Sequence, residues 1–256
     1  MKSFILIVSF FISSTSFACE CIKDILVHNF QKSAFVAKIK ILKVSKPTAD
    51  GEYQDATIEV LELYKGKKIR TIKIQSSLNT DCNLIVDENT NWLVFAQINR
   101  SGVLQFDLCS GSMQLDRKMS SIDYPNAQAN YIKEINQKIA VLQFFKTKHI
   151  AQPNEYNLYL KYNERLHDLF KGYEGESQKN AVYQLTVEKD LSISKIKALK
   201  EFDNQKLSKA LLAYLKEKAK VNTRNISAIK KRTQLIVVYY FYPAEEEYQS
   251  FISEFD

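Results

Sequence analysis

Cys19-Glu20-Cys21 follows directly on residues 1–18, which read MKSFILIVSFFISSTSFA. A basic start, a short apolar run and small residues at the end are the pattern of a secretory signal peptide, here cut after Ala18. The apolar run is too short to span a bilayer, and no later stretch reaches the roughly 20 apolar residues that a spanning helix needs. We therefore expect an exported mature chain, periplasmic or extracellular, that begins at Cys19 and has no transmembrane segment.

A cysteine at the cleavage site has a second interpretation, because bacterial lipoproteins are cut immediately before the cysteine that becomes acylated. The residues before Cys19 are Ser16-Phe17-Ala18, which differ from the usual Leu-small-small pattern. Acylation would also remove the thiol that a disulfide at Cys19 requires. A lipid anchor at Cys19, on a surface or outer-membrane lipoprotein scaffold, is therefore an alternative to simple export.

The composition is that of a folded globular protein. The chain has 256 residues, of which 45% are hydrophobic, enough for one large or two ordinary domains. Six glycines and four prolines argue against glycine-rich phosphate loops and long proline-rich linkers. The net charge of +7 comes mostly from lysines spread along helical-looking stretches. In an exported protein such lysines are typical of solvated faces, so we expect no nucleic-acid partner.

Four cysteines remain after the signal sequence: Cys19, Cys21, Cys82 and Cys109. An even number in an exported chain suggests two disulfides, which can be connected in three ways. A bond between Cys19 and Cys21 is disfavoured, because so small a ring strains disulfide geometry. Both other pairings tie the N-terminus to positions far along the chain.

Between these cysteines, short segments of alternating or continuous apolar residues are separated by turn residues. A helix is expected over about 21–30, where the apolar residues have helical spacing. Strands are then expected over 34–44, 56–64, 69–74, 92–98 and 103–108. Five strands with one short helix suit a small closed β-barrel of the OB type.

This set of features resembles the netrin-like domains of tissue inhibitors of metalloproteinases over residues 19–115. The features shared are a Cys-x-Cys at the mature N-terminus, Ala34-Phe35-Val36-Ala37-Lys38-Ile39 in a strand, Leu63-Tyr64-Lys65-Gly66 at a strand end, Cys82, Trp92-Leu93-Val94-Phe95-Ala96, and Cys109 after a strand. The resemblance implies a netrin-like, OB-type barrel in which Cys19 pairs with Cys82 and Cys21 pairs with Cys109.

The resemblance also implies a function for the N-terminal tripeptide. In such inhibitors the free α-amino group and the carbonyl of the first cysteine chelate the zinc of a metalloprotease, and the next residue, here Glu20, enters the protease's pocket. A catalytic zinc keeps an open position, and an α-amino group titrating near ~7.7 to 8 supplies a neutral nitrogen for it. Cys19, Glu20 and Cys21 would then bind the protease. The alternative is that the disulfides only fasten the N-terminus to the barrel.

After the barrel, the apolar periodicity becomes helical. Residues 116–175 are expected to form a helical spacer, with helices over about 125–148 and 155–172. Residues 244–256 contain Glu245-Glu246-Glu247 and are expected to be an acidic tail.

Residues 176–243 lie between the spacer and the tail and are expected to form an α-β-β-α-β module. Its strands are expected over 181–188, 192–200 and 233–242, with a helix around 207–215. This order is similar to the periplasmic C-terminal domain of TonB-type energy transducers, particularly over 182–190. Such a module suggests strand addition, in which an edge strand pairs with an extended peptide from an envelope protein. The most apolar strand, 235–242, is expected inside the sheet. The alternative is a module that only packs on the preceding helices.

No catalytic constellation is present in the sequence. His28, His149 and His167 are scattered, and the chain has no His-Glu-x-x-His, nucleophile-elbow or P-loop pattern. If all four cysteines are in disulfides, none serves as a nucleophile or metal ligand. We therefore expect an α+β, non-enzymatic binding protein without a cofactor or an intrinsic metal. Its partner is expected to be a protein, either an envelope protein or a zinc metalloprotease.

The exported form should therefore begin at Cys19, carry no acyl group and contain two disulfides. Intact mass measured before and after reduction, together with N-terminal sequencing, checks all three features. Reduction is expected to add two hydrogens for each disulfide. An acyl mass on Cys19 would establish the lipoprotein alternative, and a start at another residue would remove the zinc-chelating hypothesis.

Overall fold

The computed structural model describes residues 21, 24–120, 122, 124–151, 153–174, 179–223 and 226–254. Over these residues the chain is of the α+β class, with four helices and three β-sheets. The expected signal peptide and two residues of the N-terminal tripeptide, Cys19 and Glu20, lie outside the described residues.

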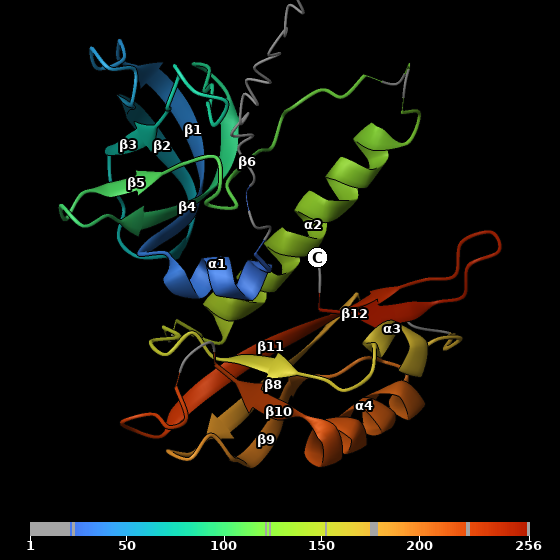
Figure 1. Ribbon diagram of the computed structural model, residues 1–256. Helices are drawn as coiled ribbons and strands as arrows, with labels where there is room; N and C mark the ends of the chain where they lie inside the picture. The colour runs from blue at the N-terminus through green and yellow to red at the C-terminus, as the bar shows by residue number, and fades with distance from the viewer. Residues whose placement is uncertain are drawn as a thin grey trace, which may run out of the picture.

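A closed five-stranded barrel forms the first part of the fold (Figure 1). Its strands are β1 (Phe35–Val44), β2 (Tyr53–Lys65), β3 (Thr71–Gln75), β4 (Asn91–Ile98) and β5 (Leu104–Phe106). They follow the order β1-β2-β3-β5-β4, and a pairing of β4 with β1 closes the barrel. β3 and β5 are parallel, and the other neighbouring strands are antiparallel. A short strand, β6 (Met113–Gln114), also pairs with β4. The five strands predicted from the sequence are confirmed.

The end of β2 fixes the barrel to the helix α1 (Leu26–Lys32). Gly66 has φ +90°, and a Cβ there would lie 2.6 Å from the Ala34 carbonyl oxygen, so the turn requires glycine. The Lys65 ammonium donates hydrogen bonds to the carbonyls of Phe30 and Gln31, at 2.8 and 3.1 Å. These carbonyls belong to the last turn of α1. Carbonyl groups in the last turn of a helix have no N–H partner within the helix, so Lys65 supplies the donor. Burial lowers the pKa of Lys65 to about 8.

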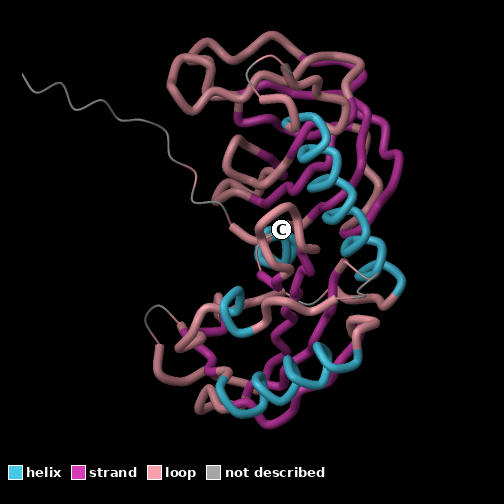
Figure 2. Tube along the Cα trace, turned by 90° about the vertical axis from the view of Figure 1, so that its right-hand side faces the viewer, coloured by secondary structure: helices cyan, strands magenta, loops and turns pink. Residues whose placement is uncertain are grey.

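Two helices, α1 and α2 (Ala127–Thr147), lie between the barrel and the C-terminal sheet (Figures 1 and 2). They share one hydrophobic core with both, here called the junction core, which contains Leu26, Val27, Phe30, Val36, Tyr64, Leu93, Phe95, Val141, Leu142, Phe145, Ile150, Val182, Ile236, Val238 and Tyr240. The rings of Phe30 and Phe145 pack with their centroids 5.0 Å apart. The segment expected as a helical spacer therefore supplies a helix to the core that joins the two sheets.

The second helix expected in that segment, over 155–172, is wrong. These residues contain β7 (Tyr159–Lys161) and the short helix α3 (Leu166–Leu169). β7 pairs with β10 (Lys220–Asn222), far along the chain. This pairing provides the backbone hydrogen bonds that a helix would have made locally. Leu160 and Leu166 are buried in the core between the C-terminal sheet and α4.

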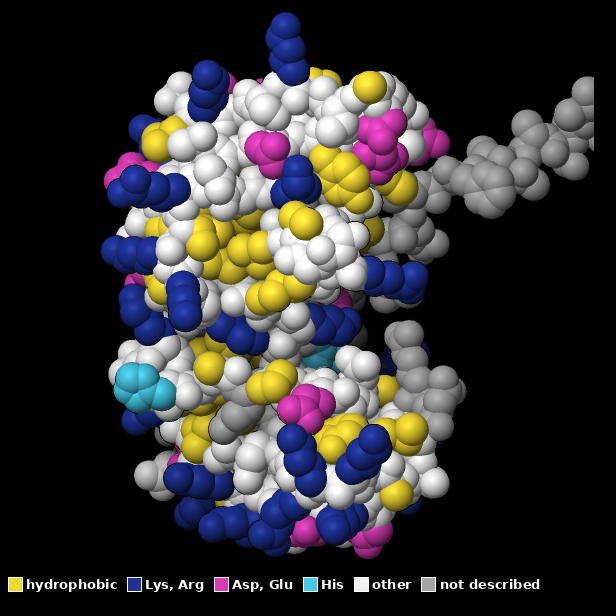
Figure 3. Space-filling view, turned by 90° about the vertical axis from the view of Figure 1, so that its left-hand side faces the viewer, with side chains coloured by type: hydrophobic (Ala, Val, Ile, Leu, Met, Phe, Trp, Pro, Cys, Tyr) yellow, Lys and Arg dark blue, Asp and Glu magenta, His cyan; other side chains and the backbone are white. Residues whose placement is uncertain are grey.

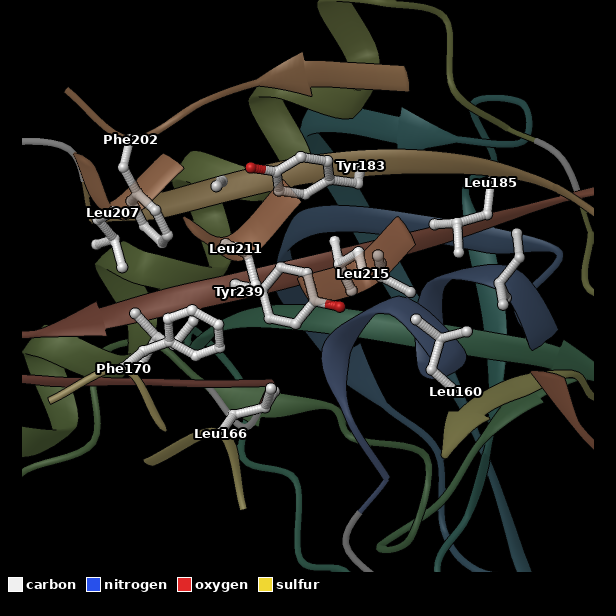
Figure 4. Close-up of a cluster of buried hydrophobic side chains, with 14 of the residues drawn as sticks. Leu160, Leu166, Phe170, Tyr183, Leu185, Phe202, Leu207, Leu211, Leu215 and Tyr239 are labelled. Atoms are coloured by element: carbon white, nitrogen blue, oxygen red, sulfur yellow. The ribbon is translucent and has the colours of Figure 1, made fainter. Parts of the chain in front are cut away.

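The C-terminal sheet is antiparallel and has the strand order β12-β11-β8-β9. The strands are β8 (Asn180–Val187), β9 (Ile193–Lys200), β11 (Thr233–Tyr242) and β12 (Phe251–Ser253). Helix α4 (Gln205–Lys218) covers one face through Leu207, Leu211 and Leu215 (Figure 4). Alternation and helical spacing predicted β8, β9, α4 and β11. They did not predict β12, which lies within the expected acidic tail.

β11 is buried on both of its faces. Ile236, Val238 and Tyr240 belong to the junction core, and Leu235, Val237 and Tyr239 belong to the core under α4. Its two edges differ, because β8 pairs with it along Thr233–Tyr240 but β12 pairs only with Tyr240–Tyr242. The expectation that this strand lies inside the sheet therefore holds for only part of its length.

A single shared core predicts that the two sheets unfold together. Phe145→Ala is expected to lower the free energy of unfolding by about 3 to 5 kcal/mol, because it removes a fully buried aromatic ring. Urea unfolding should be followed by the fluorescence of Trp92, the only tryptophan, and by far-UV circular dichroism. Both signals are expected to shift together. Gln143→Ala, at an exposed position of α2, is the control and should change little. An unchanged Trp92 transition in Phe145→Ala would contradict the shared core.

Candidate functional site

A cavity of about 970 Å³ lies at the junction of the barrel and the C-terminal sheet. We call it the junction cavity. Its lining residues are Asp24, Ile25, His28, Asn29, Gln31, Lys32, Gln97, Cys109, Asn154, Tyr156, Asn157, Tyr159, Leu160, Thr223, Ile226, Leu235, Ile236, Val237, Val238 and Glu254. Figure 3 shows one face of this junction, where apolar surface, basic side chains and a histidine meet along the seam between the upper and lower halves of the molecule.

The floor of the junction cavity includes the open edge of β11. The Phe241 N–H donates to the Lys179 carbonyl at 3.0 Å, in register with the pairing of β8 and β11. In an antiparallel pair, residues two apart along a strand repeat this arrangement, so the odd-numbered residues of β11 bond to β8. The N–H and C=O groups of Ile236 and Val238 therefore point away from β8. In the described part of the chain no strand pairs with them.

The α1 wall carries a charged group of three residues. The Asp24 carboxylate lies 2.8 Å from His28 Nδ1 and also bonds to the Lys32 ammonium. Burial acts to raise the pKa of Asp24, but hydrogen bonds and positive charge from His28 and Lys32 outweigh it and bring the pKa down to about 2. An Asp–His pair is also how enzymes orient a general base. Among the described residues, no serine, threonine or cysteine is hydrogen-bonded to His28.

Gln31 contributes an unusual polar group to the same wall. Its side chain is buried, with the residue 5% exposed, and neither its amide nitrogen nor its amide oxygen has a hydrogen-bond partner in the described structure. An unpaired buried amide costs about 1 to 3 kcal/mol, so native proteins rarely leave one without a reason. The two amide atoms have almost no accessible surface, so a ligand in the junction cavity does not reach them.

Glu254 is the acidic group contributed by the C-terminal sheet. The Tyr162 hydroxyl donates to its carboxylate at 2.6 Å and lies 2.6 Å from the Tyr239 hydroxyl. Burial raises the pKa of Glu254 to about 7, against the opposing effects of the Tyr162 hydrogen bond and the positive charge of His28. No lysine or arginine among the described residues forms a salt bridge with it.

The predicted disulfide between Cys21 and Cys109 is confirmed. Cys82 is also disulfide-bonded, and its expected partner Cys19 lies outside the described residues, as does Glu20. The Cys21–Cys109 bond holds the chain just before α1. Nearby, Gly111 has φ +80°, and a Cβ there would lie 2.4 Å from Asn29 Nδ2. This close contact and the disulfide keep α1 in place beside the cavity.

Sequence reasoning did not find the residues of the junction cavity. Asp24, just before α1, and His28 and Lys32 within it recur every four residues, but solvated helix faces show the same spacing. Nothing in the sequence pattern marked Glu254 as a site residue, since it lies in the segment expected to be an acidic tail. Of the predicted tripeptide, the structure describes Cys21, whose disulfide partner Cys109 is a lining residue.

Comparisons with known proteins do not assign this chain to a family. Neither a scan of protein-family models nor a search of curated proteins finds a match. Within the described residues, no helix is both long and apolar enough to cross a membrane.

The raised pKa of Glu254 predicts a pH-dependent stability. The folded state favours the neutral carboxyl, so this contribution is fully present below the ordinary pKa of 4.5 and is lost as the pH rises through about 7. Glu254→Gln is neutral at every pH. We expect it to match the wild type in Tm at pH 4.5 and to exceed it at pH 8, as measured by thermal unfolding. Glu246→Gln, at an exposed position, should show no such trend. A Tm difference that does not grow with pH would contradict this account.

Proposed function

We propose that this chain is an exported, non-catalytic binding protein that captures an extended segment of another polypeptide in the junction cavity. The captured segment is added as a strand to the open edge of β11. The observation that carries this proposal is that the backbone N–H and C=O groups of Ile236 and Val238, two lining residues, face away from β8 and have no strand partner among the described residues. An extended peptide presents complementary groups at the same two-residue repeat, about 6.6 to 6.8 Å.

The size and lining of the cavity suit such a ligand. Five extended residues span about 17 Å and would cover the open edge between Thr233 and Val238. Main-chain hydrogen bonds to β11 would give affinity, because both backbones otherwise carry unpaired polar groups. Alternate side chains of the peptide would face α1, where His28 and Lys32 can contact polar groups, or the apolar side near Leu160.

The proposal includes the two resemblances found in the sequence: the barrel is a netrin-like domain, and the C-terminal module is similar to that of TonB-type proteins. The closed order β1-β2-β3-β5-β4, with the parallel pair β3 and β5, supports an OB-type, netrin-like barrel. The order β8-β9-α4-β11 supports a TonB-like C-terminal module. In this arrangement the barrel and α1 form one wall of a peptide site that the C-terminal sheet completes.

Selection of a random peptide library against the oxidised mature chain tests the proposed function. Enriched peptides are expected to alternate apolar residues of high strand propensity. N-methylation of every second amide of an enriched peptide then probes its backbone contacts, with affinity measured by fluorescence anisotropy. Methylating the set that faces β11 should weaken binding by at least about tenfold, and more than methylating the other set. Equal effects of the two sets, or no enrichment at all, would overturn strand addition.

Matched protein variants locate the binding site in the same experiment. His28→Trp places a large side chain in the junction cavity beside the open edge and should reduce affinity for the enriched peptide by about tenfold. Lys209→Trp, on the exposed face of α4 outside the cavity, should leave affinity unchanged. Equal losses in both variants would place the binding site elsewhere.

A further inference from the structure

Glu254 stands at the end of the open edge of β11. Ser253, the last residue of β12, pairs with Tyr240, so β12 stops where the unpaired part of β11 begins. Glu254 is the next residue along this edge and lines the junction cavity. A strand added to β11, as proposed above, therefore has one of its ends against Glu254.

Within the described residues, the Glu254 carboxylate has no salt bridge to a lysine or arginine, whereas three other partly buried acids have one. Asp24 is paired with Lys32, Glu188 with Arg232 at 2.7 Å, and Glu62 with Lys146 at 3.3 Å. Glu254 accepts a hydrogen bond from Tyr162 and forms no salt bridge with a lysine or arginine of the described residues. Removing a carboxylate from water without a counter-ion is costly.

Among the described residues, the groups that face Glu254 form no salt bridge with it. Tyr162 and Tyr239 are neutral hydroxyls whose pKa values burial raises well above their ordinary value. The charge of His28 favours the ionised form of Glu254, but the hydrogen bond of its Nδ1 goes to Asp24. The carboxylate is therefore open to a positively charged group that enters the cavity.

We infer that Glu254 binds an ammonium group of the captured peptide and so selects peptides with a positive charge at that end. Two sources share this chemistry: the free α-amino group of the peptide and a lysine side chain. The α-amino group is the source if the peptide runs antiparallel to β11, as β12 does. The N-terminus of such a peptide would lie at the end of β12, next to Glu254. This inference rests on the proposed function.

Synthetic peptides with an alternating Val-Thr body test this inference on the oxidised mature chain. One has a free N-terminal amine, the second is acetylated, the third is acetylated with lysine as its first residue, and the fourth is acetylated with norleucine there. The amine or the lysine should improve affinity by about tenfold over the neutral peptides, and the arm that gains affinity identifies the source. In Glu254→Gln this preference should disappear, while Glu246→Gln should retain it.

The outcomes separate the two proposals. If neutral and charged peptides bind the wild type equally, or if the preference persists in Glu254→Gln, Glu254 does not select charge and strand addition still stands. If no peptide binds the wild type, the proposed function fails and this inference fails with it. Binding of the neutral peptides to Glu254→Gln shows that the variant is folded.

Discussion

The burial of β11 on both faces is the constraint on which this structure depends. One face lies in the junction core with α1, α2 and the barrel strands, and the other lies in the core under α4. Each face removes apolar side chains from water, which is the main favourable term in folding. Because the same strand serves both cores, the barrel and the C-terminal sheet form one packed structure.

This arrangement explains why a binding cavity forms at the junction. Burial on two faces does not require pairing on two edges, and β11 has a complete partner only in β8. On its other side, α1 is held in place by the Cys21–Cys109 disulfide and the Lys65 hydrogen bonds, and by the close contact of Gly111 with Asn29. The helix therefore forms a fixed wall beside an unpaired edge, and the space between them is the junction cavity.

The polar groups of the junction cavity give the proposed peptide site its chemistry. A free strand edge binds the backbone of a peptide, so the affinity that it provides depends little on the peptide's sequence. The Asp24–His28 pair and Glu254 add groups that distinguish side chains and charge. These residues come from the first helix and the last described residues of the chain, so the site exists only when the barrel and the C-terminal sheet are joined.

Much of the fold followed from local sequence patterns. Alternation predicted the barrel strands, helical spacing predicted α2 and α4, and the apolar run of β11 predicted a strand inside the sheet. These features depend on residues close together in the chain, where periodicity is informative. The prediction failed for β7, because its tyrosine and leucine spacing matches a helix while its pairing partner, β10, is distant in sequence.

The sequence by itself determined the α+β class, the strands of the barrel, and, through the family resemblance, the bond between Cys21 and Cys109. Only the tertiary structure decided that part of β11 is left unpaired on one side and which residues gather around it. Asp24 and Glu254 lie at opposite ends of the chain, and no local pattern records that they line one cavity. Their meeting depends on how α1 packs against β11, which is a property of the assembled core.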